Sequence, residues 1–85
     1  MIQKSVTVGL ADGLDASVIA SMVQLACKHT CTVHLKTEGK TVNAKSIMGM
    51  MNMAVAKGGV MTIICDGEDE ETALKNIESF VQSSI

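Results

Sequence analysis

The sequence predicts one α+β domain, residues 1–85, with the element order β-α-β-β-α-β-α and a single sheet covered by helices on one face. Three observations support this fold class. A chain of 85 residues leaves room for only one hydrophobic core. Apolar residues make up 47% of it and charged residues 19%, as is typical of globular proteins. Stretches in which apolar residues alternate with polar ones are interleaved with stretches in which apolar residues recur at helical spacing.

The first strand and the first helix are indicated by residues 2–28. Ile2, Val6 and Val8 follow the alternation of a half-buried strand, and residues 9–13 interrupt it. Asp15 is a good N-cap for a helix from Ala16 to about Lys28. One apolar stripe of this helix is formed by Ala16, Ile19, Ala20, Val23, Ala26 and Cys27. A second stripe, Val18, Met22 and Leu25, either enlarges the core or faces a partner.

A hairpin and a short helix are expected in the middle of the chain. Strand two is indicated by alternation at Cys31, Val33 and Leu35. A tight turn at residues 38–40 leads into strand three, Thr41 to Ala44. Ser46 can cap a second helix through about Met53, which a glycine at position 49 weakens.

The last strand and the last helix follow a glycine-rich stretch at residues 57–59. A nearly continuous apolar run from Val60 to Cys65 is typical of a central, buried strand. After a turn at residues 66–67, the acidic run Glu68–Glu71 lies where the dipole of the last helix favours negative charge. The apolar stripe of that helix consists of Ala73, Leu74, Ile77, Phe80 and Val81.

Composition argues against several classes of function. A net charge of -2 and an aromatic content of 1% argue against a nucleic-acid partner, which needs clustered cations or stacking platforms. No apolar run is long enough to cross a bilayer, and no signal peptide is evident. An odd number of cysteines, Cys27, Cys31 and Cys65, favours reduced thiols. We therefore expect a cytoplasmic protein without a membrane or nucleic-acid partner.

Two stretches resemble a known family. Asn43 to Gly49 reads Asn-Ala-Lys-Ser-Ile-Met-Gly, and Gly13 to Ala16 reads Gly-Leu-Asp-Ala. Both resemble HPr, the histidine-containing phosphocarrier protein of the bacterial sugar phosphotransferase system. The match continues at Gly39-Lys40, Val42, Met51, Gly58, Thr62-Ile63, Gly67, Asp69-Glu70 and Ala73-Leu74. The resemblance implies an open-faced β-sandwich, in which a four-stranded antiparallel sheet carries three helices on one face.

The phosphocarrier site of the family is altered in this chain. The family pattern is Gly-Leu-His-Ala-Arg-Pro-Ala, whereas residues 13–19 read Gly-Leu-Asp-Ala-Ser-Val-Ile. In the family, enzyme I phosphorylates the histidine, and the arginine helps to hold the phosphoryl group. Here Asp15 and Ser17 occupy those positions. A phosphocarrier needs a neutral ring nitrogen beside a cation, so we expect a degenerate site without histidyl phosphocarrier activity.

Ser46 keeps the family pattern. In Gram-positive relatives, HPr kinase/phosphorylase phosphorylates this serine, and the phosphorylated form docks to the catabolite control protein, a transcription factor. The resemblance thus implies a non-enzymatic regulatory protein of the catabolite repression HPr type, switched at Ser46. Ile47, Met48 and Met51 would form an adaptable apolar docking patch beside it, and Lys45 would partly screen the phosphate.

Two other functions stay open at this point. One is a phosphocarrier in which Asp15 is an atypical acceptor, forming an acyl phosphate; the only acidic neighbour is Asp12. The other is a protein-interaction module that is bound permanently to one partner and is never phosphorylated. A homodimer is also open, because a first strand at a sheet edge, followed by the loop at residues 9–13, would permit strand exchange.

No cofactor or metal is expected. Cys27, His29 and Cys31 offer three soft ligands within five residues, but a structural zinc site normally needs a fourth. Buried cysteines at a helix–strand junction are the simpler interpretation. His29, at the end of the first helix, and His34, on an outward face of strand two, do not replace the phosphocarrier histidine.

Overall fold

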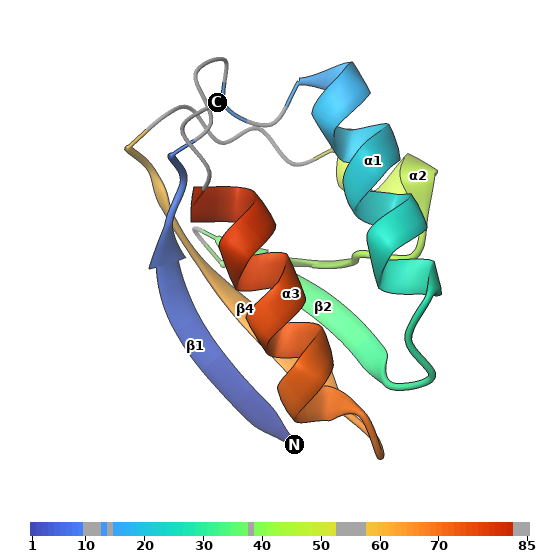
Figure 1. Cartoon of the computed structure of the whole chain (residues 1–85). Coiled ribbons are helices and arrows are strands. Elements are labelled where there is room, and N and C mark those ends of the chain that lie inside the picture. Colours follow the sequence, from blue (N-terminus) through green and yellow to red (C-terminus); the bar gives the residue numbers. More distant parts are fainter. Residues whose placement is uncertain (10–12, 14, 38, 53–57, 83–85) are drawn as a thin grey trace.

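A computed structural model describes residues 1–9, 13, 15–37, 39–52 and 58–82. Its strands are β1 (Ile2–Thr7), β2 (Thr32–Thr37), β3 (Lys40–Asn43) and β4 (Val60–Asp66). Its helices are α1 (Ala16–Cys27), α2 (Ile47–Met51) and α3 (Glu70–Gln82). The predicted element order is therefore confirmed. Figure 1 shows α3 lying along the sheet, with α1 beside it and α2 next to α1.

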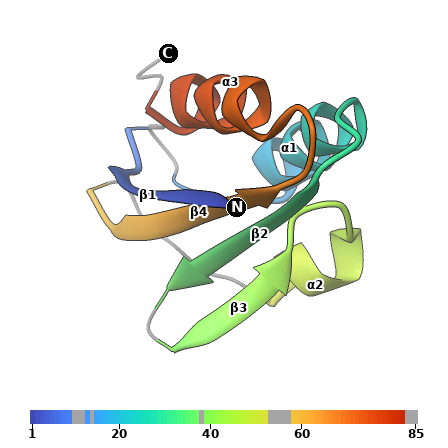
Figure 2. The ribbon, with the colours of Figure 1, turned by 90° about the horizontal axis from the view of Figure 1, so that it is seen from below.

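The four strands form one antiparallel sheet in the order β1-β4-β2-β3. β4 pairs with β1 on one side and with β2 on the other, which confirms that the apolar run from Val60 is a central strand. β1 and β3 are the two edges, and α1 and α3 cover one face of the sheet (Figure 2). The chain thus has the predicted open-faced sandwich architecture.

The core lies between that face and the helices. Its buried residues are Val6, Val8, Ile19, Met22, Val23, Ala26, Cys31, Val33, Leu35, Ala44, Met50, Met61, Ile63, Cys65, Ala73, Ile77 and Val81. The second stripe of α1 joins this core, because Met22 is fully buried while Val18 and Leu25 are half-buried against it. α1 packs against both α2 and α3, so a broad face of the helix is covered. This outcome favours the larger core over a partner surface.

Some predicted details were wrong. α2 ends at Met51, before the predicted Met53, which lies outside the described residues, whereas α1 ends at Cys27 with Lys28 as its C-cap, in agreement with the predicted end at about Lys28. Cys27 is exposed, whereas Cys31 and Cys65 are buried. On a helix, Cys27 is rotated about 100° from the core-facing Ala26, and its thiol donates to the Lys45 carbonyl at 3.9 Å. The pattern of β2 leaves His34 half-buried on the side opposite Val33 and Leu35, as predicted.

Two contacts join strands of the sheet to neighbouring elements. Gly67 follows β4 with φ +151°, and a Cβ atom there would lie 2.6 Å from the Cα of Cys31, so the chain passes closely over the start of β2. Lys4 of the edge strand β1 pairs with Glu78 of α3 at 2.6 Å.

Among the helices that the structure describes, none has the length and apolar character needed to span a membrane.

Candidate functional site

Ser46 is the N-cap of α2. Its backbone is extended (φ -114°, ψ 116°), and its Oγ accepts a hydrogen bond from the Gly49 amide at 3.2 Å. A turn places it there, because the Ser46 amide donates to the Asn43 carbonyl at 3.0 Å. The side chain is half-buried at the surface end of the helix. A hydroxyl in this position can carry a negative group next to free helix amides.

The apolar side chains after Ser46 divide between surface and core. Ile47, Met48 and Met51 are 54%, 82% and 59% exposed, and we call these three residues the α2 patch. Met50 is fully buried in the core. The α2 patch is therefore available to a partner, as a docking role requires.

Asp15 and Ser17 form a helix cap at the start of α1. Asp15 Oδ1 accepts from the Val18 amide at 2.9 Å and from the Ser17 hydroxyl at 3.1 Å. These two bonds, that from Val18 foremost, lower the pKa of Asp15. The carboxylate is ionised, and its capping oxygen is already occupied. Asp12, the acidic neighbour considered above, lies outside the described residues.

Lys45 connects the Ser46 segment to the end of α1. Its Nζ donates to the His29 carbonyl at 2.7 Å, and the Lys45 carbonyl accepts the Cys27 thiol contact described above. The Lys45 amide donates to Asn43 Oδ1 at 2.9 Å. This lysine therefore binds a helix C-terminus, where a cation is favoured, and its ammonium is not bonded to Ser46.

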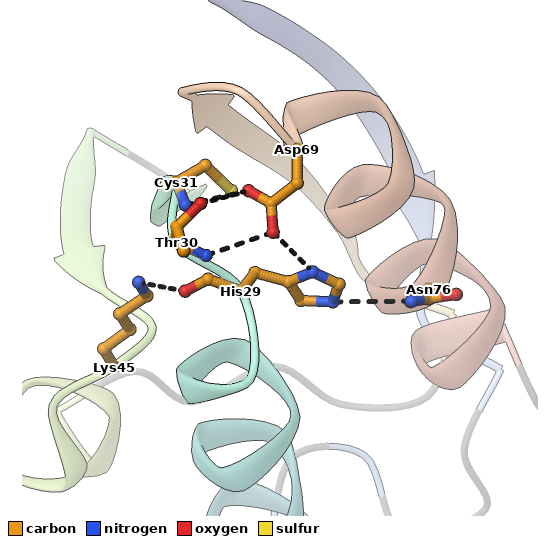
Figure 3. A network of polar contacts seen from close by, with 6 residues as sticks. All are labelled: His29, Thr30, Cys31, Lys45, Asp69 and Asn76. Carbon is orange, nitrogen blue, oxygen red and sulfur yellow. Dashed lines mark hydrogen bonds and ion pairs between the residues drawn. The ribbon is translucent and has the colours of Figure 1, made fainter.

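Asp69 is the centre of a polar network that the sequence did not reveal (Figure 3). Its Oδ1 accepts from the Cys31 amide at 2.9 Å and from the Thr30 hydroxyl at 3.2 Å. Its Oδ2 accepts from the Thr30 amide at 3.0 Å and contacts His29 Nδ1 at 3.1 Å. Desolvation opposes ionisation of Asp69, but the amides of Cys31 and Thr30 and the other donors outweigh it and lower its pKa.

This network joins the start of α3 to the junction between α1 and β2. Sequence reasoning assigned Asp69 to the dipole of α3 only, because its partners are 38 to 40 residues away in the chain. The sequence signal for this network was an acidic residue two positions after Gly67. An acidic run at the start of a helix gives the same pattern, so the signal did not distinguish a network centre from a charge favoured by the helix dipole. Asp69 and its partners are therefore an addition to the predicted set.

The histidines and cysteines are not gathered into a metal site. Among the described residues, no group of three or more His, Cys, Asp or Glu side chains is placed to hold a metal ion. Cys27, His29 and Cys31 therefore do not form one. Burial raises the pKa of the Cys31 thiol, and it raises that of Cys65 to about 12. Both buried thiols are protonated at neutral pH and belong to the core.

Comparisons with known proteins agree with this fold. The family model described as "PTS HPr component phosphorylation site" matches residues 2–83. The HPr-like protein Crh of Bacillus subtilis (strain 168) is 46% identical over 85 residues, which cover 100% of both chains. The crystal structure of a phosphocarrier protein HPr from Bacillus anthracis is similar, with a TM-score of 0.92 at 43% identity over 95% of this chain and 96% of that one.

A crystal structure of Bacillus subtilis Crh is also similar. Its TM-score is 0.79 at 46% identity, over 100% of this chain and 98% of that one, and it is described as a dimer with a swapped domain.

Proposed function

The chain belongs to the HPr family, and from that premise we propose that it is a non-enzymatic regulatory protein of carbon catabolite control, phosphorylated on Ser46. Its partners in this proposal are HPr kinase/phosphorylase and the catabolite control transcription factor, all in the cytoplasm. The observation that carries the proposal is a contrast between two helix caps. Ser46 retains the family's motif beside an exposed apolar patch, whereas Asp15 stands in place of the histidine as an occupied cap.

Phosphorylation would change the charge of the surface around α2. A phosphoserine carries a charge of about -1.5 to -2, and at position 46 it would lie next to the α2 patch. The helix dipole favours this charge, so the fold should tolerate it. Because Lys45 already bonds to the His29 carbonyl, the phosphate oxygens stay available to a partner. A combined anionic and apolar surface is the feature that we expect the transcription factor to recognise.

The first test is phosphorylation itself. Incubation with HPr kinase/phosphorylase and ATP is expected to add one phosphoryl group, which peptide mass spectrometry should place on Ser46. Ser46→Ala should abolish the modification, and Ser79→Ala, at an exposed serine of α3, should leave it unchanged. A wild-type protein that stays unmodified would remove the switch.

The same preparation tests the phosphocarrier alternative. Enzyme I and phosphoenolpyruvate are expected to leave no label on the protein, because Asp15 offers a charged carboxylate in place of a ring nitrogen. A label that disappears in Asp15→Ala would instead favour a phosphocarrier with an atypical acceptor.

The α2 patch is expected to contribute to docking. Met48→Ser should weaken binding of the phosphorylated protein to the transcription factor by about tenfold, because we expect Met48, the most exposed side chain of the patch, to be one of the few anchors whose truncation costs more than about 1 kcal/mol. The matched control is Val60→Ser, which removes a 57% exposed apolar side chain from β4. Titration calorimetry checks both affinities. Equal losses of affinity in the two variants would show that the α2 patch has no specific part in docking.

A permanently bound module predicts a different result. In that case, pull-down from cells should recover the same partners with Ser46→Ala as with the wild type. Under our proposal, the transcription factor should be lost from the Ser46→Ala sample, although the protein stays folded and loses only the α2 cap, about 1 kcal/mol of stability.

Homodimer formation by strand exchange is also part of the proposal. β1 lies at the edge of the sheet and is followed by residues 10–12, which are outside the described part of the chain. Crh of Bacillus subtilis has been solved as a swapped dimer. Sedimentation analysis over a range of concentrations is expected to show a monomer and a dimer that interconvert slowly, because exchange requires β1 to leave the sheet. A monomer at every concentration would exclude the exchange.

A further inference from the structure

His29 lies where α1, β2, α3 and the Lys45 segment meet (Figure 3). Its side chain is 10% exposed. Its ring contacts one residue of the turn before α3 and one residue of α3 itself. Nδ1 is 3.1 Å from Asp69 Oδ2, and Nε2 is 3.4 Å from Asn76 Nδ2. The His29 carbonyl accepts the Lys45 ammonium at 2.7 Å. Both ring nitrogens are therefore engaged.

The contact with Asp69 determines which ring nitrogen carries the proton. Asp69 accepts three further hydrogen bonds, from the Thr30 amide, the Thr30 hydroxyl and the Cys31 amide, so its carboxylate is ionised and offers no proton. Nδ1 must then be the donor, whether the ring is neutral or charged. In the neutral ring, Nε2 is left as a bare acceptor, which fits donation by the Asn76 amide nitrogen.

Protonation reverses this requirement at Asn76. The charged ring carries a second N–H on Nε2, which would face the two N–H donors of the amide. Turning the amide by 180° brings Oδ1 toward the ring and restores a hydrogen bond. At the same time, the contact with Asp69 changes from a hydrogen bond to an ion pair with a charge-assisted bond. The neutral and the charged ring thus select opposite orientations of one side chain on α3.

The charged surroundings of the ring come from every element packed on it. Asp69 contributes an anion from the turn before α3, Lys45 contributes a cation at the His29 carbonyl, and Cys31 contributes a protonated thiol at the start of β2. Asn76 is neutral in both states. Among the residues that the structure describes, Asn76 is the partner of Nε2, and its amide can answer a change of ring charge by turning in place.

We propose that His29 and Asn76 form a proton-operated switch, in which the orientation of the Asn76 amide follows the charge of His29. The contacts of His29 with Asp69 and Asn76, which join the end of α1 to α3, strengthen when the ring is charged. The switch is operated by the proton that the imidazole ring gains or loses. Through the carbonyl of His29 it borders Lys45, the residue before Ser46. It does not depend on phosphorylation of Ser46.

Nuclear magnetic resonance of the unphosphorylated, full-length protein tests the switch. At high pH, the imidazole nitrogen shifts are expected to identify the Nδ1–H tautomer of His29. As pH falls, the side-chain amide signals of Asn76 should move with the same midpoint as the ring of His29. His34, on the opposite side of β2, is the internal control, and its midpoint should not appear in the Asn76 signals. A neutral ring protonated on Nε2, or Asn76 signals that ignore the titration, would overturn the proposal.

Variants at position 76 provide an independent test. Asn76→Asp supplies an anionic acceptor to the charged ring and should raise the titration midpoint of His29 by about one unit or more. The matched control, Asn52→Asp, adds the same charge at the C-cap of α2, and the midpoint should stay within a few tenths of the wild-type value. Equal shifts in the two variants would show that position 76 does not act on the His29 ring through direct contact. Both positions are exposed, so both proteins should fold.

Discussion

Gly67→Ala is expected to lower the free energy of unfolding by about 3 kcal/mol, a large part of the stability of so small a domain. Two causes act together. The backbone of Gly67 has φ +151°, a conformation that side chains disfavour, and an added Cβ would lie 2.6 Å and 2.7 Å from the Cα and Cβ of Cys31. Cys31 is buried in the core, so neither atom can move aside cheaply. Urea unfolding followed by circular dichroism measures the loss.

Gly39→Ala is the matched control for this prediction. Gly39 has φ +82°, and no atom lies within 4 Å of the position where its Cβ would be. Only the backbone strain of a left-handed conformation is then expected, about 1 kcal/mol. If the two variants lose the same stability, the close approach of Gly67 to Cys31 is not what holds this corner together.

Asp69→Ala is expected to give the second large effect. It removes the acceptor of the bonds from the Thr30 amide, the Thr30 hydroxyl, the Cys31 amide and His29 Nδ1. The Cys31 amide is part-buried and would be left without that partner, which is more costly than the loss of an exposed bond. We expect the melting temperature to fall by at least about 5 °C. The control is Glu68→Ala, at an exposed acidic residue of the same turn.

Asp69 should also shape the pH dependence of stability. Its pKa is lowered in the folded protein, so its contribution is complete above the unfolded value, about 3.9. That contribution is lost as pH falls below this value toward the folded pKa. The acid side of the stability curve should therefore be flatter in Asp69→Ala than in the wild type. Some acid sensitivity will remain, because hydrogen bonds from Val18 and Gly67 lower the pKa values of Asp15 and Glu70 in the same direction.

The fold could be predicted because its signals are local. Alternation, helical spacing and turn residues placed all seven elements in the right order, and the two N-caps followed from residues three positions apart, Asp15 with Val18 and Ser46 with Gly49. Such contacts depend on the backbone of a single turn, and the identity of the capping residue is enough to predict them. The resemblance to the HPr family added the antiparallel pairing of the four strands.

The rest of the site depends on packing between distant segments. The predicted docking patch included exposed Met48 and left out buried Met50, but a helix of five residues has too few turns for its sequence to show a clear apolar stripe. Its orientation is set by contact with α1 and β3. Likewise, the partners of Asp69 come from the junction between α1 and β2, which only the folded chain brings near. The exposure of Cys27 has the same origin.

The ion pair on the edge strand has a consequence for solubility. β1 is open along one side, where a strand of a neighbouring molecule could add to the sheet and start an aggregate. Lys4 turns toward the helices and is fixed there by Glu78. A charged side chain that points toward the helices from an edge strand disfavours pairing with a strand of another molecule. An added strand would have to enclose the Lys4 ammonium. We therefore expect this lysine to disfavour fibre formation in a concentrated solution of the protein.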